Sequence, residues 1–228
     1  MDHKPGLLSR KWVRVLLYAV STLLLACGVF LLVREHVLLP DPDFVMPETP
    51  APTPEPTPEP TPVPGETPVP TPSPTPYVRP VPVRISFVEA KQSCEVFPGG
   101  VLENGQMEVI DRADAATWLE NVSGSLRPAP GEEGNAIIAG HKSKDGVAGT
   151  FKVLWDAKAG DAVVIDYEDG TQGWFYIDSI DRYPYQEVPA SVMSANAESP
   201  QLTLITCIGE WDSSGGTSSE RLVAVCKP

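Results

Sequence analysis

The sequence predicts an all-β domain that follows a transmembrane helix and a proline-rich linker. Three observations lead to this. The C-terminal two thirds of the 228-residue chain hold seven or eight short alternating or apolar stretches between turn residues. One uncharged apolar run lies near the N-terminus, and alternating prolines separate the two regions. The expected divisions are a cytoplasmic N-terminus at 1–14, an anchor at 15–33, a linker at 34–82 and the domain at 83–228.

The predicted anchor is the run "VLLYAVSTLLLACGVFLLV", residues 15–33. Nineteen helical residues at about 1.5 Å each span roughly the hydrocarbon core. Four basic residues precede the run, so the positive side is expected in the cytoplasm and the domain outside the cell, as in a single-pass membrane protein. The alternative is lipidation at Cys27, at the end of "LLAC"; the apolar run continues past Cys27 and favours the anchor.

The linker contains "PETPAPTPEPTPEPTPVPGETPVPTPSPTP", residues 47–76. Alternating proline removes backbone donors and fixes φ, which favours polyproline II. Thirty residues in that conformation reach on the order of 90 Å. We interpret this segment as a spacer that lifts the domain off the membrane.

The elements of the domain follow from hydrophobic period and turn residues. "VRISFV" and, after "FPGG", "QMEVI" alternate as strands do, whereas "ADAATWLE" consists of helix formers behind Asp111 as N-cap. "NAIIAGH" is a buried-type strand between glycines, and the next two strands form a hairpin across "EDGTQG". The expected strands are 83–88, 106–110, 135–141, 161–169, 173–185, 201–207 and 220–226, with one short helix at 113–120. A β-barrel or a β-sandwich fits this pattern.

The domain is acidic. Residues 77–228 carry 12 Lys and Arg against 22 Asp and Glu, a net charge of −10. No basic patch interleaves with aromatic residues, so nucleic acid is not an expected partner.

Three chemically distinctive residues lie at predicted strand ends. His141 is the only histidine of the domain and follows Gly140; Cys207 ends "QLTLITC"; Arg221 opens the last strand. On one rim they would supply a nucleophile, an acid/base and an anion-stabilising group. A buried small cysteine and a structural histidine are the alternatives that the residues alone leave open.

The motifs around these residues resemble those of sortases, the cysteine transpeptidases of the Gram-positive-type envelope. In family order, the chain has "PGEEGNAIIAGH" before the histidine, "GTFKVLWDAKAGDAVVI" after it, "LITC" at the nucleophile and "SSERLVAV" around the arginine. The resemblance covers about 83–228 and is nearest to class F, with classes D and E as alternatives.

The resemblance implies a closed β-barrel and a catalytic trio. Cys207 is the implied nucleophile, His141 the general acid/base and Arg221 the stabiliser of oxyanion and substrate, with Thr206 and Gly140 at the substrate pocket. The implied substrate is a secreted protein with an LPXTG-like C-terminal sorting signal. The implied acceptor is an amine, such as that of a cell-wall peptide, and no cofactor is implied.

The two remaining domain cysteines, Cys94 and Cys226, lie near the first and last strands. For a domain outside the cell, the sequence leaves two interpretations open: a disulfide between them, or two separate buried thiols. Three widely spaced cysteines and one histidine without a CxxC do not predict a metal site.

Three rival functions are weaker. A papain-like peptidase places its cysteine before its histidine, and an L,D-transpeptidase shows an "SHGC"-type nucleophile; neither pattern is present. A non-catalytic stalked binding module on a degenerate sortase fold would also carry the anchor and linker, but it has no need of the trio.

Overall fold

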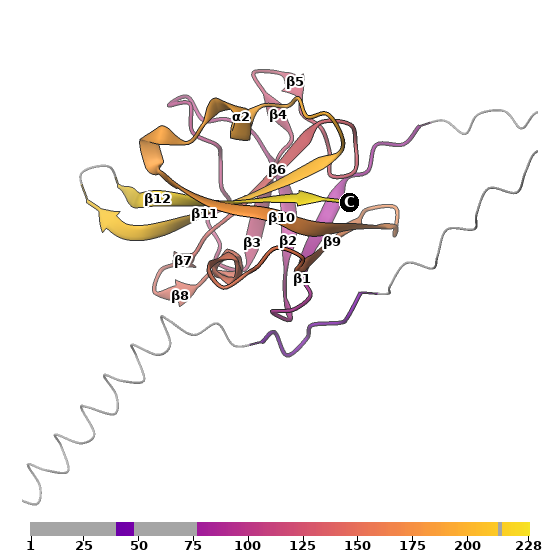
Figure 1. Cartoon of the computed structure of the whole chain (residues 1–228), viewed down its shortest axis with the longest axis horizontal. Coiled ribbons are helices and arrows are strands. Elements are labelled where there is room, and N and C mark those ends of the chain that lie inside the picture. Colours follow the sequence, from indigo (N-terminus) through magenta and orange to yellow (C-terminus); the bar gives the residue numbers. More distant parts are fainter. Residues whose placement is uncertain (1–39, 48–76, 214–215) are drawn as a thin grey trace, which may run out of the picture.

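The computed structural model describes residues 40–47, 77–213 and 216–228. Eight of its strands close into one barrel, in the order β1-β2-β3-β6-β11-β12-β10-β9 (Figure 1). The barrel strands are β1 (Pro82–Phe87), β2 (Gln92–Gly99), β3 (Ala115–Leu119), β6 (Asn135–Gly140), β9 (Ala162–Tyr167), β10 (Gln172–Pro184), β11 (Gln201–Asp212) and β12 (Thr217–Lys227). The all-β prediction and the closed barrel are confirmed, and a sandwich is excluded.

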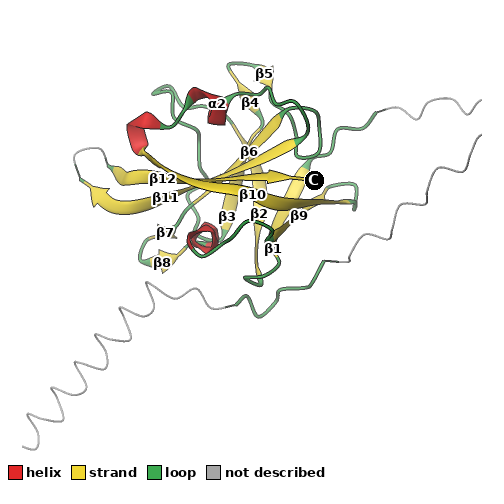
Figure 2. Ribbon diagram, viewed as in Figure 1, coloured by secondary structure: helices red, strands yellow, loops and turns green. Residues whose placement is uncertain are grey.

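The remaining elements are small and lie around the barrel (Figure 2). They are the hairpins β4 (Asn121–Val122) with β5 (Ser125–Leu126) and β7 (Ser143–Lys144) with β8 (Val147–Ala148), the 3₁₀ turns η1 (Thr150–Trp155) and η2 (Tyr185–Glu187), and the helix α2 (Ala190–Met193). None of the helices in the described ranges is long and apolar enough to cross a membrane. The predicted anchor at 15–33 lies outside those ranges.

Of the eight pairs of adjacent strands in the barrel, two are parallel and the other six are antiparallel. The parallel pairs are β2 with β3 and β6 with β11. Parallel neighbours bring their carboxyl ends to the same edge of a sheet. The residues that follow β6 therefore lie beside the late residues of β11, although they are more than sixty positions apart in the sequence.

The core fills the barrel from alternate strand positions. On β11, Leu202, Leu204 and Ile208 belong to the buried cluster, and Leu222, Ala224 and Cys226 do so on β12. Phe151 of η1 is part of the buried core and packs edge-on against Phe87, with ring centroids 5.4 Å apart. Because strand side chains alternate in direction, the residues between these positions face outward.

The predicted helix at 113–120 is wrong: this segment is β3. All five residues of β3 are buried, since Ala116 and Trp118 face the core while a loop covers the outer face. A strand buried on both faces shows no period of two, and its alanines suit a helix equally well in isolation. Pairing with β2 and β6 decides the outcome, because helix propensity is a weak preference that tertiary contacts override.

The predicted strand at 106–110 is also wrong. It forms one isolated bridge, between Val101 and Met107, and otherwise belongs to the loop that covers β3. The loop is fixed where the Ile110 backbone N–H donates to Thr117 Oγ1 at 2.8 Å. This contact also brings the end of the loop toward the residues that follow β6.

The last two strands are longer than predicted. The stretch after Cys207 continues β11 and pairs with β12 up to Trp211–Ser218 and Asp212–Thr217, which makes a hairpin arm at the left of Figure 1. The register shifts between Ile208 and Trp211. Gly209 lies there with φ of 81°, and a Cβ at this position would be 2.4 Å from Ser219 Oγ.

Of the two interpretations of Cys94 and Cys226, the structure shows the second: no disulfide joins them, and both are buried free thiols. Cys94 lies on β2 and Cys226 on β12, which are four places apart in the closed order of eight strands. The two side chains therefore extend from opposite walls. A disulfide needs Cα atoms within about 7 Å, so these walls cannot be bridged.

Candidate active site

Cys207 and Arg221 are cross-strand partners. The antiparallel register of β11 and β12 pairs them directly. Side chains that are directly opposite in an antiparallel pair extend to the same face. A thiol and a guanidinium thus leave the same patch of the barrel wall.

His141 reaches the other side of Cys207 through the parallel pair. Ile205 of β11 aligns with Ala139 of β6, and Thr206 Oγ1 donates to the Gly140 carbonyl at 2.9 Å. Two residues further along each chain from the aligned pair come Cys207 and His141. The structure therefore brings the three predicted residues to three adjacent strands, in the order β6, β11, β12.

This group lies on the outer face of the barrel. Cys207 and Arg221 alternate with core residues on their strands and are half-buried. His141, directly after the fully buried β6, is half-buried too. The three side chains are thus partly accessible from outside, whereas the barrel interior is filled with side chains.

The His141 imidazole lies in a partly desolvated setting. Burial lowers its pKa below the ordinary value, while a backbone hydrogen bond to Ile110 and the charge of Asp111 act in the opposite direction. Its Nε2 atom is buried and has no hydrogen-bond partner among the described residues. The covering loop thus orients the ring and leaves Nε2 for other chemistry.

Asp111 is itself held in place by an ion pair. Its carboxylate lies 2.7 Å from the Lys144 ammonium of β7, which lowers the pKa of Asp111. The two charges have opposite effects on the pKa of His141: the Asp111 charge raises it, and the Lys144 charge lowers it. This pair therefore tunes the histidine through charge.

Arg221 is held by several contacts. Its guanidinium lies over the Tyr185 ring, 4.4 Å from the centroid, and one nitrogen donates to Thr217 Oγ1 at 2.8 Å. Another nitrogen donates to the carbonyls of Ser218 and Glu220, at 3.0 and 3.1 Å. A guanidinium fixed in this way is preorganised to receive an anion.

Thr206 and Gly140 lie on the inner side of the same strands. Thr206 is only 2% exposed and shares the face of Leu204 and Ile208, with its hydroxyl on the Gly140 carbonyl. A Cβ on Gly140 would lie 2.4 Å from the Phe151 ring. Both residues align β6 with β11 from within the barrel, and they do not face the side of the sheet that carries Cys207.

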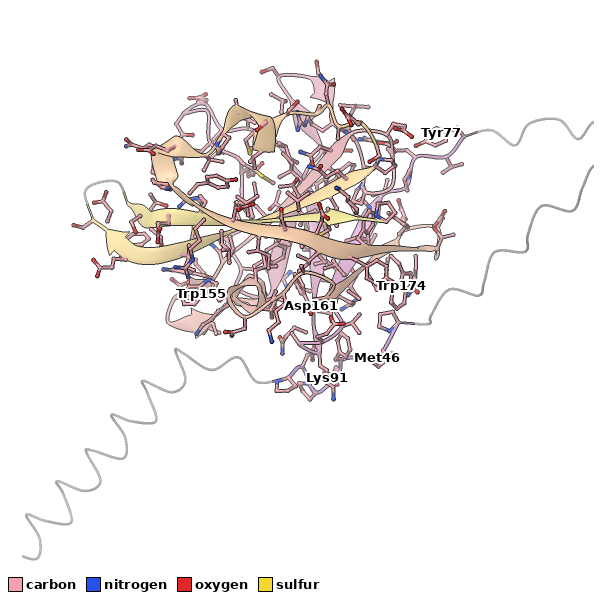
Figure 3. The ribbon with its side chains drawn as sticks, in the orientation of Figure 1. Met46, Tyr77, Lys91, Trp155, Asp161 and Trp174 are labelled. Atoms are coloured by element: carbon pink, nitrogen blue, oxygen red, sulfur yellow. The ribbon has the colours of Figure 1, made fainter. Side chains whose placement is uncertain are left out.

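Two further residues flank Cys207, and the sequence did not single them out. The Trp155 indole Nε1 donates to the Cys207 carbonyl at 3.2 Å, and Lys142 Nζ donates to the Gly209 carbonyl at 3.1 Å. The Lys142 ammonium also lies over the Trp155 ring, 5.7 Å from its centroid. Figure 3 shows Trp155 beside the hairpin arm. These contacts fix the backbone at Cys207 and two residues after it.

A cavity of about 310 Å³ lies beside Trp155 and Lys142. It is lined by these two residues, Lys152 and the β7–β8 hairpin. In the described part of the chain, no three His, Cys, Asp or Glu side chains gather as they would around a metal ion.

Several solved structures resemble the chain. Sortase E1 from Streptomyces coelicolor is 18% identical, with 65% of this chain and 87% of that chain covered and a TM-score of 0.49. Sortase A from Corynebacterium diphtheriae is 23% identical, with coverage of 65% and 60% and a TM-score of 0.45. Sortase C1 from Streptococcus agalactiae is 20% identical, with coverage of 63% and 64% and a TM-score of 0.45. The chain thus spans less than two thirds of the latter two.

A search among curated proteins gives no match. The family model of the sortase domain, however, matches residues 96–228, which is more than half of the chain. The matched region includes β11 and β12, which carry Cys207 and Arg221, and β6, which His141 directly follows. The chain belongs to the sortase family.

Proposed function

We propose that the chain is a membrane-anchored extracellular cysteine transpeptidase, which cuts a C-terminal LPXTG-like sorting signal and transfers the protein to an amine of the cell envelope. The observation that carries the proposal is the position of Cys207 between the end of β6 and Arg221, on the outer face of the barrel. Family membership supports a transpeptidase in general terms.

In the first half-reaction, the Cys207 sulfur attacks the carbonyl carbon of the scissile peptide. Negative charge then develops on the carbonyl oxygen, and the Arg221 guanidinium donates hydrogen bonds to it. His141 takes the thiol proton and returns it to the nitrogen of the leaving amine as the C–N bond breaks. The product is a thioester between Cys207 and the substrate.

In the second half-reaction, an acceptor amine attacks the thioester. His141 takes the proton of the attacking nitrogen, the C–S bond breaks, and the thiol is restored as the new amide forms. Burial lowers the pKa of His141, so the imidazole is neutral at neutral pH and is ready to accept that proton.

The proposed location rests on the sequence, and the proposed partners rest on the resemblance to sortases. Residues 15–33 anchor the chain in the membrane, with the barrel outside the cell. The substrates are secreted proteins with sorting signals, and the acceptor is an amine such as that of a cell-wall peptide. Class F is the subclass that the motif after Cys207 favours.

The proposal is tested by incubating the full chain in detergent with sorting-signal peptides and a small amine, and by measuring the masses of the products by mass spectrometry. We expect a peptide cut within the motif and joined to the amine, and no such product from Cys207→Ala. A folded chain with a reduced Cys207 that transfers none of the peptides would instead support the binding-module alternative.

A further inference from the structure

Residues 40–47, which we call the strap, lie against the barrel although they precede the proline-rich segment. The Asp41 backbone N–H donates to the Lys91 carbonyl at 2.9 Å, and Ser93 Oγ donates to Asp41 Oδ2 at 3.3 Å. Figure 1 shows the strap running below the turn between β1 and β2. The chain thus reaches the barrel once before residue 48.

The strap has a defined local structure. The Asp41 carboxylate accepts from the Asp43 N–H at 3.0 Å, and the Phe44 N–H donates to the Asp41 carbonyl at 3.1 Å. Phe44 is half-buried. On the barrel side, the Arg84 guanidinium donates to Ser93 Oγ at 3.3 Å. Asp41 therefore both folds the strap and bonds it to β2.

The chain returns to the same barrel at a different place. The Tyr77 hydroxyl donates to the Glu132 carboxylate, and Arg79 lies 3.6 Å from both Glu120 and Glu132. The Arg79 guanidinium also lies 4.7 Å from the centroid of the Trp118 ring. Figure 3 shows Met46 and Tyr77 at separate positions on the barrel. Both ends of the proline-rich segment are therefore held by one body.

We propose that the strap, and not the proline-rich segment, sets the distance between the barrel and the membrane. This rests on the anchor in the proposed function. If the anchor ends at Val33, the seven residues from 34 to 40 reach at most about 25 Å, however they are arranged. The proline-rich segment leaves the barrel and comes back to it, so its reach of about 90 Å does not lift the domain.

The strap also determines which side of the barrel is near the membrane. Pro40, Asp41 and Pro42 line one cavity, of about 500 Å³, together with Val147 and Ala148 of β8. The β7–β8 hairpin follows His141 and Lys142 directly in the sequence. The strap itself is bonded to β2, four places from β12 in the closed order, so the chain reaches the barrel at the wall opposite the one that carries Cys207 and Arg221.

Cross-linking tests the docked strap in the full chain. In a Cys27→Ala, Cys207→Ala background, Asp41→Cys with Ser93→Cys should form a disulfide under mild oxidation, because the backbone hydrogen bond from residue 41 to the Lys91 carbonyl needs neither substituted side chain. The control pairs Ser93→Cys with Thr53→Cys, which is 40 rather than 52 residues away. If the strap is docked, the 41–93 disulfide should form at least roughly tenfold faster than the control disulfide. If the strap is not docked, the control disulfide, which closes the shorter loop, should form about 1.5-fold faster than the 41–93 disulfide, and this result would overturn the proposal.

Length variants test the consequence in lipid vesicles. Energy transfer is measured between a dye on an Asp169→Cys variant of the same background and acceptor lipids. We expect deletion of residues 52–63 to leave the transfer unchanged, and a twelve-residue Gly-Ser insertion after Leu39 to reduce it. Increased transfer after the deletion would show a stalk and contradict the proposal. Neither experiment uses catalysis, so a failure here is distinct from a failure of the proposed function.

Discussion

The inner and outer faces of the β11–β12 pair each carry a cysteine, and the two thiols differ in their surroundings. Burial inside the barrel raises the pKa of Cys226 to about 12, and on β2 it does the same for Cys94. Cys207 faces outward on β11, with Arg221 beside it. Whether a cysteine of these strands packs in the core or is a candidate nucleophile therefore depends on which face its position takes, because side-chain direction alternates along a strand.

Alkylation is the strongest test of this contrast. A thiol with a pKa of about 12 is roughly one part in 10⁴ thiolate at pH 8, and it is also shielded. We expect iodoacetamide to modify Cys207 in the folded domain and to leave Cys94 and Cys226 unmodified until guanidinium is added. Peptide mapping by mass spectrometry reads the sites. Equal modification of all three before denaturation would remove the contrast.

Arg221→Lys tests whether the guanidinium acts on a developing oxyanion. An ammonium cannot reproduce the planar fork, and loss of one oxyanion donor costs about 10²–10³-fold in rate. We expect kcat/KM for a sorting-signal peptide to fall within that range. Arg182→Lys, an exposed arginine on neighbouring β10, is the matched control. A rate close to wild type for Arg221→Lys would refute this role.

Tyr185→Leu tests what holds the guanidinium. A cation–π contact contributes about 1–2 kcal/mol, so its loss should reduce kcat roughly 5- to 30-fold with little change in KM. Tyr185→Phe keeps the ring and loses only the hydroxyl that accepts from Gln106. It should stay near wild type. If the phenylalanine and leucine variants are equally impaired, the hydroxyl and not the ring is responsible.

Asp111→Asn should produce the smallest effect, a shift in the pH profile. The Asp111 charge raises the pKa of His141, and in the variant Lys144, whose charge lowers it, keeps only Asp145 as an ion-pair partner. Both changes lower the histidine pKa, so His141 remains neutral to lower pH and the acid limb of kcat should move downward. Asp169→Asn, on the β9–β10 turn, is the control. An upward shift would contradict the assigned electrostatics.

The part of the fold with a clear period could be predicted from the sequence. β1, β6, the β9–β10 hairpin and the cores of β11 and β12 appear where alternation or a buried apolar run predicts them. β3 was misread because burial on both faces removes the period. The hairpin arm was missed because "EWDSSGGTSSE" has few apolar residues, and cross-strand pairing forms the strands there.

The residues of the candidate site also divide into those that the sequence could predict and those that it could not. His141, Cys207 and Arg221 could be singled out because their chemistry is rare in this domain and lies at strand ends. Trp155 and Lys142 act on backbone carbonyls 52 and 67 positions away, and Tyr185 acts through its ring on Arg221. Such contacts depend on the closed barrel, and no local motif encodes them.

The central claim is that Cys207 forms a thioester with a sorting signal. The most direct measurement is the intact mass of the full chain after brief incubation with a peptide library, followed by peptide mapping and treatment with hydroxylamine. The account predicts an acyl adduct on Cys207 that hydroxylamine releases, and none on Cys207→Ala. An adduct on another residue, or a peptide cut without any acylated Cys207, would contradict it.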